Sequence, residues 1–167
     1  MSERRQKTLS LKLPVRVIRK VLRDPRESLL LMRMASWVLL LSSLLKVRTL
    51  PRALELVSTR VRPSRLDELE TGLRLAQAAD LLLAMNVFVY RPSCWKRAAI
   101  LHRYLALNGI ESRINFGMRK EVDGTLSGHA WLERAGAPLL EPAPPNYTIT
   151  FSFPGAENKR LHQPLET

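Results

Sequence analysis

The chain contains one cysteine, Cys94, and its neighbours place it at the start of a helix. Pro92 disfavours helical backbone before it and Ser93 is a good N-terminal cap, so a helix should run from Cys94 to about Asn108. The helix dipole favours an anion at this end, and the pKa of the thiol should therefore fall. The backbone N–H groups of Cys94 and Trp95 can also contribute to an oxyanion hole. The alternative interpretation is that Cys94 is a small buried hydrophobe.

A histidine on an expected strand, His129, has the chemistry to activate this thiol. A neutral imidazole beside a thiol accepts its proton and later protonates a leaving amine. Viewed alone, His129 better fits a half-buried strand histidine that is hydrogen-bonded to backbone. The other two histidines are weaker candidates, because His102 lies in the middle of the cysteine helix and His162 lies in the tail.

A third group should orient the imidazole, and Glu141 is the best candidate. If a three-residue loop, Ala135–Ala137, connects two strands, Trp131 lies opposite Glu141 and His129 lies diagonal to it on the same face. A two-residue loop would turn Glu141 to the other face. The alternative is that Glu141 is a solvated glutamate at a strand end.

Two other acids are weaker candidates for the orienting role. Glu133 has the same parity as His129 but is expected to point toward solvent, and Asp123 is expected in a turn. Trp131 is expected to contact the substrate. No metal site is expected, since no zinc-ligand spacing accompanies Cys94, and no nucleotide fingerprint or other cofactor motif is present.

The elements around these residues predict an α+β fold, with a helical N-terminal region and the cysteine-bearing helix packed on a small antiparallel sheet. Asp24 with Pro25 marks one helix start, and Ser64 with Asp67 resembles a capping box at another. Periodicity and turn residues predict helices at about 25–46, 51–58 and 64–85. Alternation predicts a short extended segment at 87–90 and strands at about 110–119, 127–134, 138–141 and 147–153.

The length of 167 residues supports one structural domain with a substantial core. Within it we expect a basic lead-in at 1–23, a helical subdomain at 24–86, a core with Cys94 and His129 at 87–153 and a flexible tail at 154–167. The lone cysteine fits a reducing compartment, and no secretion signal is evident, so the expected location is the cytoplasm.

The net charge of +12 is concentrated in the N-terminal part, where residues 1–66 carry 16 basic and 4 acidic side chains. Such an excess attracts an acidic peptide, a partner protein, an anionic membrane or nucleic acid. Nucleic acid is not favoured, because no nucleic-acid-binding motif accompanies the charge. Contact with a membrane surface through residues 28–46 is also less favoured, since the uncharged run Met34–Leu45 is too short to span about 30 Å.

Three stretches together resemble the transglutaminase-like, papain-like cysteine peptidase superfamily, and more narrowly the leader peptidases of lasso-peptide gene clusters. The matching stretches are Arg91–Ala98, Asn108–Arg113 and His129–Glu133, and the leucine-rich helix that begins at Asp24-Pro25 is also similar. The likeness covers roughly residues 20–145.

The resemblance implies that Cys94 attacks the bond between leader and core of a ribosomally made precursor peptide, with His129 as its base and a thioester as the intermediate. The family usually has an aspartate where this chain has Glu141, which departs from the pattern. Because the chain starts almost directly with the leucine-rich region, it is similar to the stand-alone form. The implied partners are therefore the precursor peptide, a separate leader-recognition protein and an ATP-dependent lasso cyclase.

Two other functions fit the same residues. One is a different enzyme on this fold, an amidase or acyltransferase that uses Cys94 and His129. The other is a non-catalytic binding or scaffold module in a peptide-maturation complex, in which the cysteine is incidental.

Overall fold

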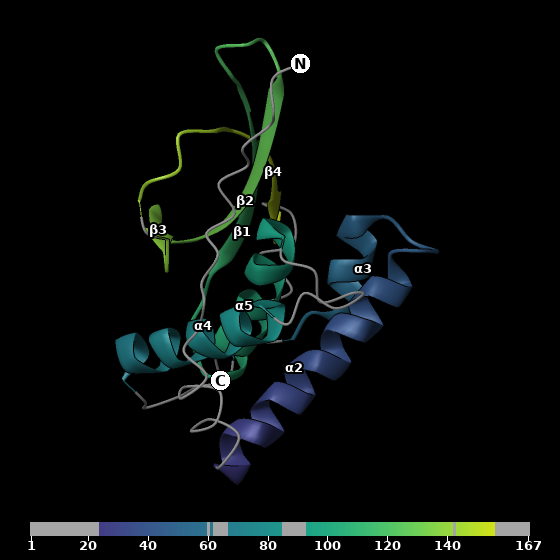
Figure 1. The fold of residues 1–167 in the computed structure, drawn as a ribbon, viewed down its shortest axis with the longest axis vertical. Helices are drawn as coiled ribbons and strands as arrows, with labels where there is room; N and C mark the ends of the chain where they lie inside the picture. Colours follow the sequence, from purple (N-terminus) through teal and green to yellow (C-terminus); the bar gives the residue numbers. More distant parts are fainter. Residues whose placement is uncertain (1–23, 60, 62–66, 85–92, 142, 156–167) are drawn as a thin grey trace, which may run out of the picture.

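The computed structural model describes residues 24–59, 61, 67–84, 93–141 and 143–155 (Figure 1). Within these ranges, four helices are followed by a four-stranded antiparallel sheet, which confirms the expected α+β class. The expected lead-in at 1–23, the extended segment at 87–90 and the tail from residue 156 lie outside the described residues.

Helix α2, Pro25–Leu44, begins where the sequence predicted, and ends two residues before the expected Lys46. Asp24 caps it by accepting a hydrogen bond from the backbone N–H of Arg26 at 2.9 Å. Among the described residues, α2 alone is long and apolar enough to cross a membrane by length and composition, with a mean hydropathy of 1.3. One stripe of the helix is nonetheless buried in the core, formed by Met34, Trp37, Val38 and Leu41.

Helices α3, Leu50–Val57, and α4, Glu68–Ala84, follow close to their expected positions. The expectation that Ser64 caps α4 in a capping box with Asp67 is wrong. Asp67 Oδ1 accepts hydrogen bonds from the N–H groups of Leu69 and Glu70 at 2.9 and 3.1 Å, so Asp67 is the cap. Aspartate caps as well as serine does, which is consistent with a helix that starts at Glu68. Ser64 itself lies outside the described residues.

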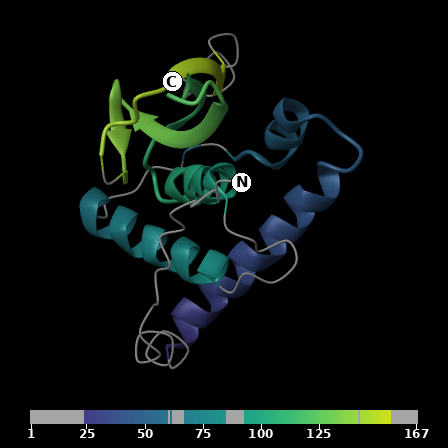
Figure 2. The same cartoon turned by 45° about the horizontal axis from the view of Figure 1, so that its top comes forward.

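Helix α5, Cys94–Leu107, carries the cysteine at its first position, as predicted. Ser93 has the extended backbone of an N-cap, but its side chain makes no capping hydrogen bond, contrary to expectation. Its Oγ is buried without a hydrogen-bond partner in the described part of the chain. Gly109, at φ +82°, closes the helix in the left-handed conformation that suits glycine. Figure 2 shows α5 between the sheet and the pair α2 and α4.

The sheet has the order β3-β2-β1-β4. Its strands are β1, Arg113–Lys120, β2, Leu126–Arg134, β3, Ala137–Leu139, and β4, Thr148–Phe153. Ile114, Ala130, Leu132 and Phe153 lie in the same buried core as the apolar side chains of α5. Side chains alternate along a strand, so His129 and Trp131 share the other face of β2.

The loop between β2 and β3 has two residues, Ala135 and Gly136, because Arg134 pairs directly with Ala137. The expected three-residue loop is therefore wrong. Both loop residues have positive φ, +49° and +82°, which gives the tight turn that matches the twist of hairpin strands. Strand β3 also ends at Leu139, two residues before the expected end at Glu141.

Candidate active site

The thiol of Cys94 is half-buried at the N-terminus of α5. It forms hydrogen bonds with the His129 side chain and with the backbone of Ala130 and Trp95. Strand β3 pairs with β2 only from Leu132 onward, so Ala130 has no partner in β3. The start of α5 and the backbone of β2 at Ala130 thus meet at the sulfur.

These contacts decide the protonation of Cys94. Burial acts to raise the pKa of the thiol, but the hydrogen bonds from His129, Ala130 and Trp95 and the charge of His129 outweigh it, and the net pKa is lowered. Each of these groups stabilises the thiolate. The site therefore favours the nucleophilic form of the sulfur.

His129 lies between the thiol and a carboxylate. Its Nε2 is 3.5 Å from Oε2 of Glu141, and the side chain of His129 is 29% exposed. The hydrogen bond with Cys94, followed by that with Glu141, raises the pKa of His129 to about 9, although burial opposes the shift. The lowered pKa of Cys94 and the raised pKa of His129 together favour the ion pair of thiolate and imidazolium over the neutral pair.

The strand register alone does not explain why the Glu141 side chain lies near His129. In the observed register, continuation of β3 would place Glu141 opposite Ala130, on the wrong face for His129. The strand stops first, because Leu140 adopts φ +58°, a left-handed conformation that a leucine rarely takes. This break in the pleat redirects Glu141, whose side chain is only 11% exposed. The prediction that Glu141 lies near His129 stands, and the register argument behind it was wrong.

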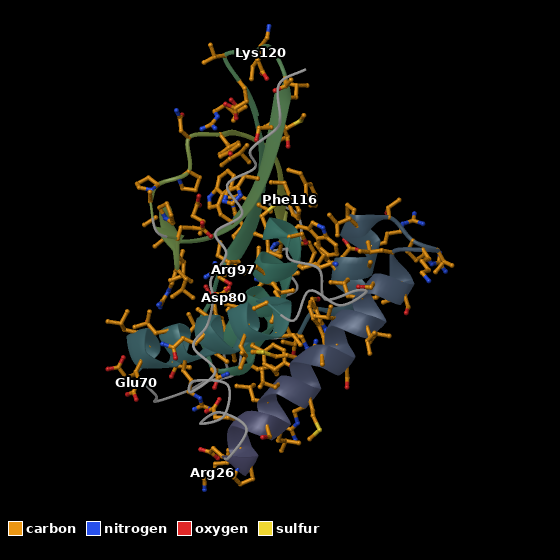
Figure 3. All side chains as sticks on the ribbon, in the orientation of Figure 1. Arg26, Glu70, Asp80, Arg97, Phe116 and Lys120 are labelled. Atoms are coloured by element: carbon orange, nitrogen blue, oxygen red, sulfur yellow. The ribbon has the colours of Figure 1, made fainter. Side chains whose placement is uncertain are left out.

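The sequence reasoning missed Arg97, which connects Glu141 to the helices. Its Nε is 2.7 Å from Asp80 Oδ1 of α4, and its Nη1 is 3.5 Å from Glu141 Oε1. The same Nη1 donates to the carbonyl oxygen of Leu140 at 3.3 Å. Figure 3 labels Arg97 and Asp80 close together beside α5 and α4. The available signal was spacing, since Arg97 lies three residues after Cys94 on the same helix.

Trp131 lies behind the imidazole and is 4% exposed. Its ring is stacked 6.0 Å from that of His129 and lies 6.3 Å from that of Tyr147, measured between centroids. Gly117 makes room for this packing, because a Cβ there would approach the Trp131 ring to 2.9 Å and Tyr147 to 2.8 Å. Tyr147 was not predicted, is less buried and lies 5.3 Å from the His129 ring. The assignment of Trp131 to substrate contact stays a prediction.

The weaker candidates have other partners. Glu133 accepts a hydrogen bond from the buried Asn115 at 2.8 Å and so does not simply point to solvent. Asp123 bonds to Thr125 within the turn between β1 and β2. His102 contacts Ser112 at 3.1 Å, and His162 lies outside the described residues.

A comparison with protein families identifies the superfamily of the chain. The model of the transglutaminase-like superfamily matches residues 37–152, more than half of the chain, and this range includes Cys94, His129 and Glu141. No curated protein and no solved structure matched the chain. On the family match, the chain belongs to the transglutaminase-like superfamily.

Proposed function

We propose that this protein is a cysteine peptidase, with Cys94 as nucleophile, His129 as general base and acid, and Glu141 as the orienting group. One observation carries the proposal: a thiol at the N-terminus of α5 is hydrogen-bonded to His129, which lies 3.5 Å from Glu141. The same three chemical roles recur in serine and cysteine hydrolases on several unrelated folds.

The first half of the reaction forms a thioester. The Cys94 thiolate attacks the carbonyl carbon of the peptide, and backbone N–H groups at the start of α5, including that of Trp95, stabilise the oxyanion. His129 protonates the departing amine, the C–N bond breaks and the C–S bond remains.

The second half restores the enzyme. The neutral His129 removes a proton from water, whose oxygen attacks the thioester carbon, and the C–S bond breaks. The products are a free carboxylic acid and the original pair of thiolate and imidazolium. Throughout, Glu141 accepts a hydrogen bond from the ring N–H of His129 and holds the other nitrogen toward the sulfur.

For the substrate we propose a ribosomally made lasso precursor peptide, cut between leader and core in the cytoplasm. The residues that support this are those of the family resemblance, Arg91–Ala98, Asn108–Arg113 and His129–Glu133. A separate recognition protein would deliver the leader, and an ATP-dependent cyclase would close the released core.

Mass spectrometry of a leader–core peptide incubated with the full chain and the recognition protein tests this function. We expect the leader to leave as a free acid with wild type, and no product with Cys94→Ala, whose circular dichroism spectrum should be unchanged. Transfer of the leader to an added amine in preference to water would identify an acyltransferase. Cleavage by folded Cys94→Ala would contradict the proposal.

A further inference from the structure

A second concave surface lies away from Cys94, between the first half of α2, the start of α4 and the end of α5. This groove has a volume of about 730 Å³. Its apolar floor and sides include Leu29, Leu30, Trp37, Leu75 and Leu107. Leu29 and Met32, which both line the groove, are 44% and 60% exposed, so the groove presents apolar surface to solvent.

Positive charge surrounds this apolar floor. Among the residues that the structure describes, the charged side chains that line the groove are all arginines, with at least one from each of the three helices. They are Arg26, Arg33, Arg74 and Arg103. Arg74 is paired with Glu27 at 2.7 Å, and Arg103 lies over the Trp37 ring at 5.7 Å. Arg26 and Arg33 are exposed and have no ion-pair partner within the described ranges. The groove thus matches a ligand with carboxylates around an apolar stripe.

The groove and the thiol lie at opposite ends of α5. Cys94 begins this 14-residue helix, whereas Leu107, at its last position, lines the groove. At 1.5 Å per residue, Cys94 and Leu107 are separated by roughly 20 Å along the helix. An extended chain covers that distance with about six residues. A single peptide can therefore occupy both sites if such a spacer connects its two parts.

We propose that the groove binds an acidic amphipathic helical segment of the peptide that Cys94 cleaves, and this inference rests on the proposed function. Large apolar side chains at helical spacing would fill the floor, and flanking carboxylates would meet Arg26 and Arg33. Residues 1–23 of this chain are a poor occupant, because they carry eight basic side chains and one acidic side chain. An anionic membrane also attracts arginines, but a concave site built from three helices suits a helix better than a flat surface.

Fluorescence anisotropy with a labelled 18-residue peptide tests the groove directly. The probe has leucines at helical spacing and glutamates on the other positions, and the full chain carries Cys94→Ala so that cleavage plays no part. We expect this probe to bind at least tenfold more tightly than a scramble of the same composition or a version with lysines in place of glutamates. Equal binding of the three peptides would overturn the proposal.

Two matched variants locate the binding. Arg33→Glu should weaken binding about tenfold, whereas Lys120→Glu, which changes the net charge equally at the far tip of the β1–β2 hairpin, should not (Figure 3). Arg26→Glu, in the first turn of α2 (Figure 3), should also weaken binding. The same loss in Lys120→Glu as in Arg33→Glu, or competition by vesicles of anionic phosphatidylglycerol but not by the unlabelled probe, would overturn the proposal.

The peptidase function and peptide binding in the groove can be contradicted independently. Binding of the probe without any cleavage of attached peptides would contradict the peptidase function and support binding in the groove. If cleavage occurs, a probe joined to the cleavage site by eight residues should be cut faster than one joined by two. Equal rates of cleavage would contradict binding of the substrate in the groove and leave the peptidase function unaffected.

Discussion

Cys94 and His129 each change the proton affinity of the other. The thiolate is the largest influence that raises the pKa of His129, and the histidine is the largest influence that lowers the pKa of Cys94. Glu141 adds to the first effect by its hydrogen bond and its charge. Changes at Cys94 or Glu141 should therefore appear in the pH dependence through the pKa of His129.

Glu141→Gln should lower kcat/KM by about 10²-fold, the low end of what general acid–base catalysis contributes. It should also move the alkaline limb of the pH–rate profile. In wild type this limb should fall near pH 9, where His129 loses its proton. Without the carboxylate charge the pKa of His129 falls. The alkaline loss of activity should therefore begin at a lower pH than in wild type.

Glu133→Gln is the matched control for this change, since Glu133 shares the face of β2 with His129 but bonds to Asn115. Its alkaline limb should stay in place. An unchanged limb in Glu141→Gln, or the same displacement in Glu133→Gln, would remove Glu141 from its assigned role.

Arg97 acts on the chemistry through Glu141 and the Leu140 carbonyl, and is therefore a positioning residue. Arg97→Met should lower kcat about tenfold while KM changes little, because no substrate contact is lost. Arg97→Lys should recover part of kcat, since lysine keeps the charge but lacks the planar fork that reaches Asp80 and Glu141 together. Steady-state kinetics on variants with matched thermal melts measures this. An equal loss of kcat in both variants, or a change confined to the melting temperature, would contradict the role.

At the scale of elements, the β2–β3 turn fixes the register of β3, which precedes Glu141. Ala135 is exposed and has φ +49°, which costs an L-residue with a Cβ roughly 1 kcal/mol. Ala135→Asn should recover much of this cost, because asparagine tolerates the left-handed region, and should raise the melting temperature by about 2–4 °C. Gly136→Ala, at φ +82°, should lower it. Calorimetry showing no difference between the two variants would refute this account of the turn.

The elements were largely predictable because local signals determine them. Proline and serine before Cys94 marked the start of α5, and turn residues separated the strands. The direction of the Glu141 side chain was not predictable, because it depends on the left-handed backbone of Leu140. Leucine rarely adopts this conformation, and no local sequence signal indicates it. The contribution of Arg97 was missed for a similar reason: Asp80 and Glu141 become its neighbours only when α4, α5 and the end of β3 pack together.

For the whole molecule, α2 is part of the same core as the candidate active site. Met34 is fully buried in the cluster that also contains Ile100 of α5 and Leu132 of β2. The family match likewise begins inside α2, at residue 37. The N-terminal helix should therefore unfold together with the sheet that carries His129.

Met34→Ala should reduce the free energy of unfolding by about 2–5 kcal/mol, the usual cost of emptying a buried methionine site. Met32→Ala should change it by less than about 0.5 kcal/mol, because Met32 is 60% exposed. Urea unfolding followed by circular dichroism gives both values, and alkylation of Cys94 at neutral pH in the same samples shows whether the site is lost in the same transition. Similar effects of the two substitutions would mean that α2 is not integral to the core.

The most direct test of the central claim, the thiolate–imidazolium pair of Cys94 and His129, is the rate of iodoacetamide alkylation of Cys94 as a function of pH. We expect the wild-type rate to rise with an inflection well below the value of about 8.5 for a free thiol, and the inflection to move up in His129→Ala. An inflection at or above that value in the folded wild-type protein, or one that His129→Ala leaves unchanged, would contradict the account.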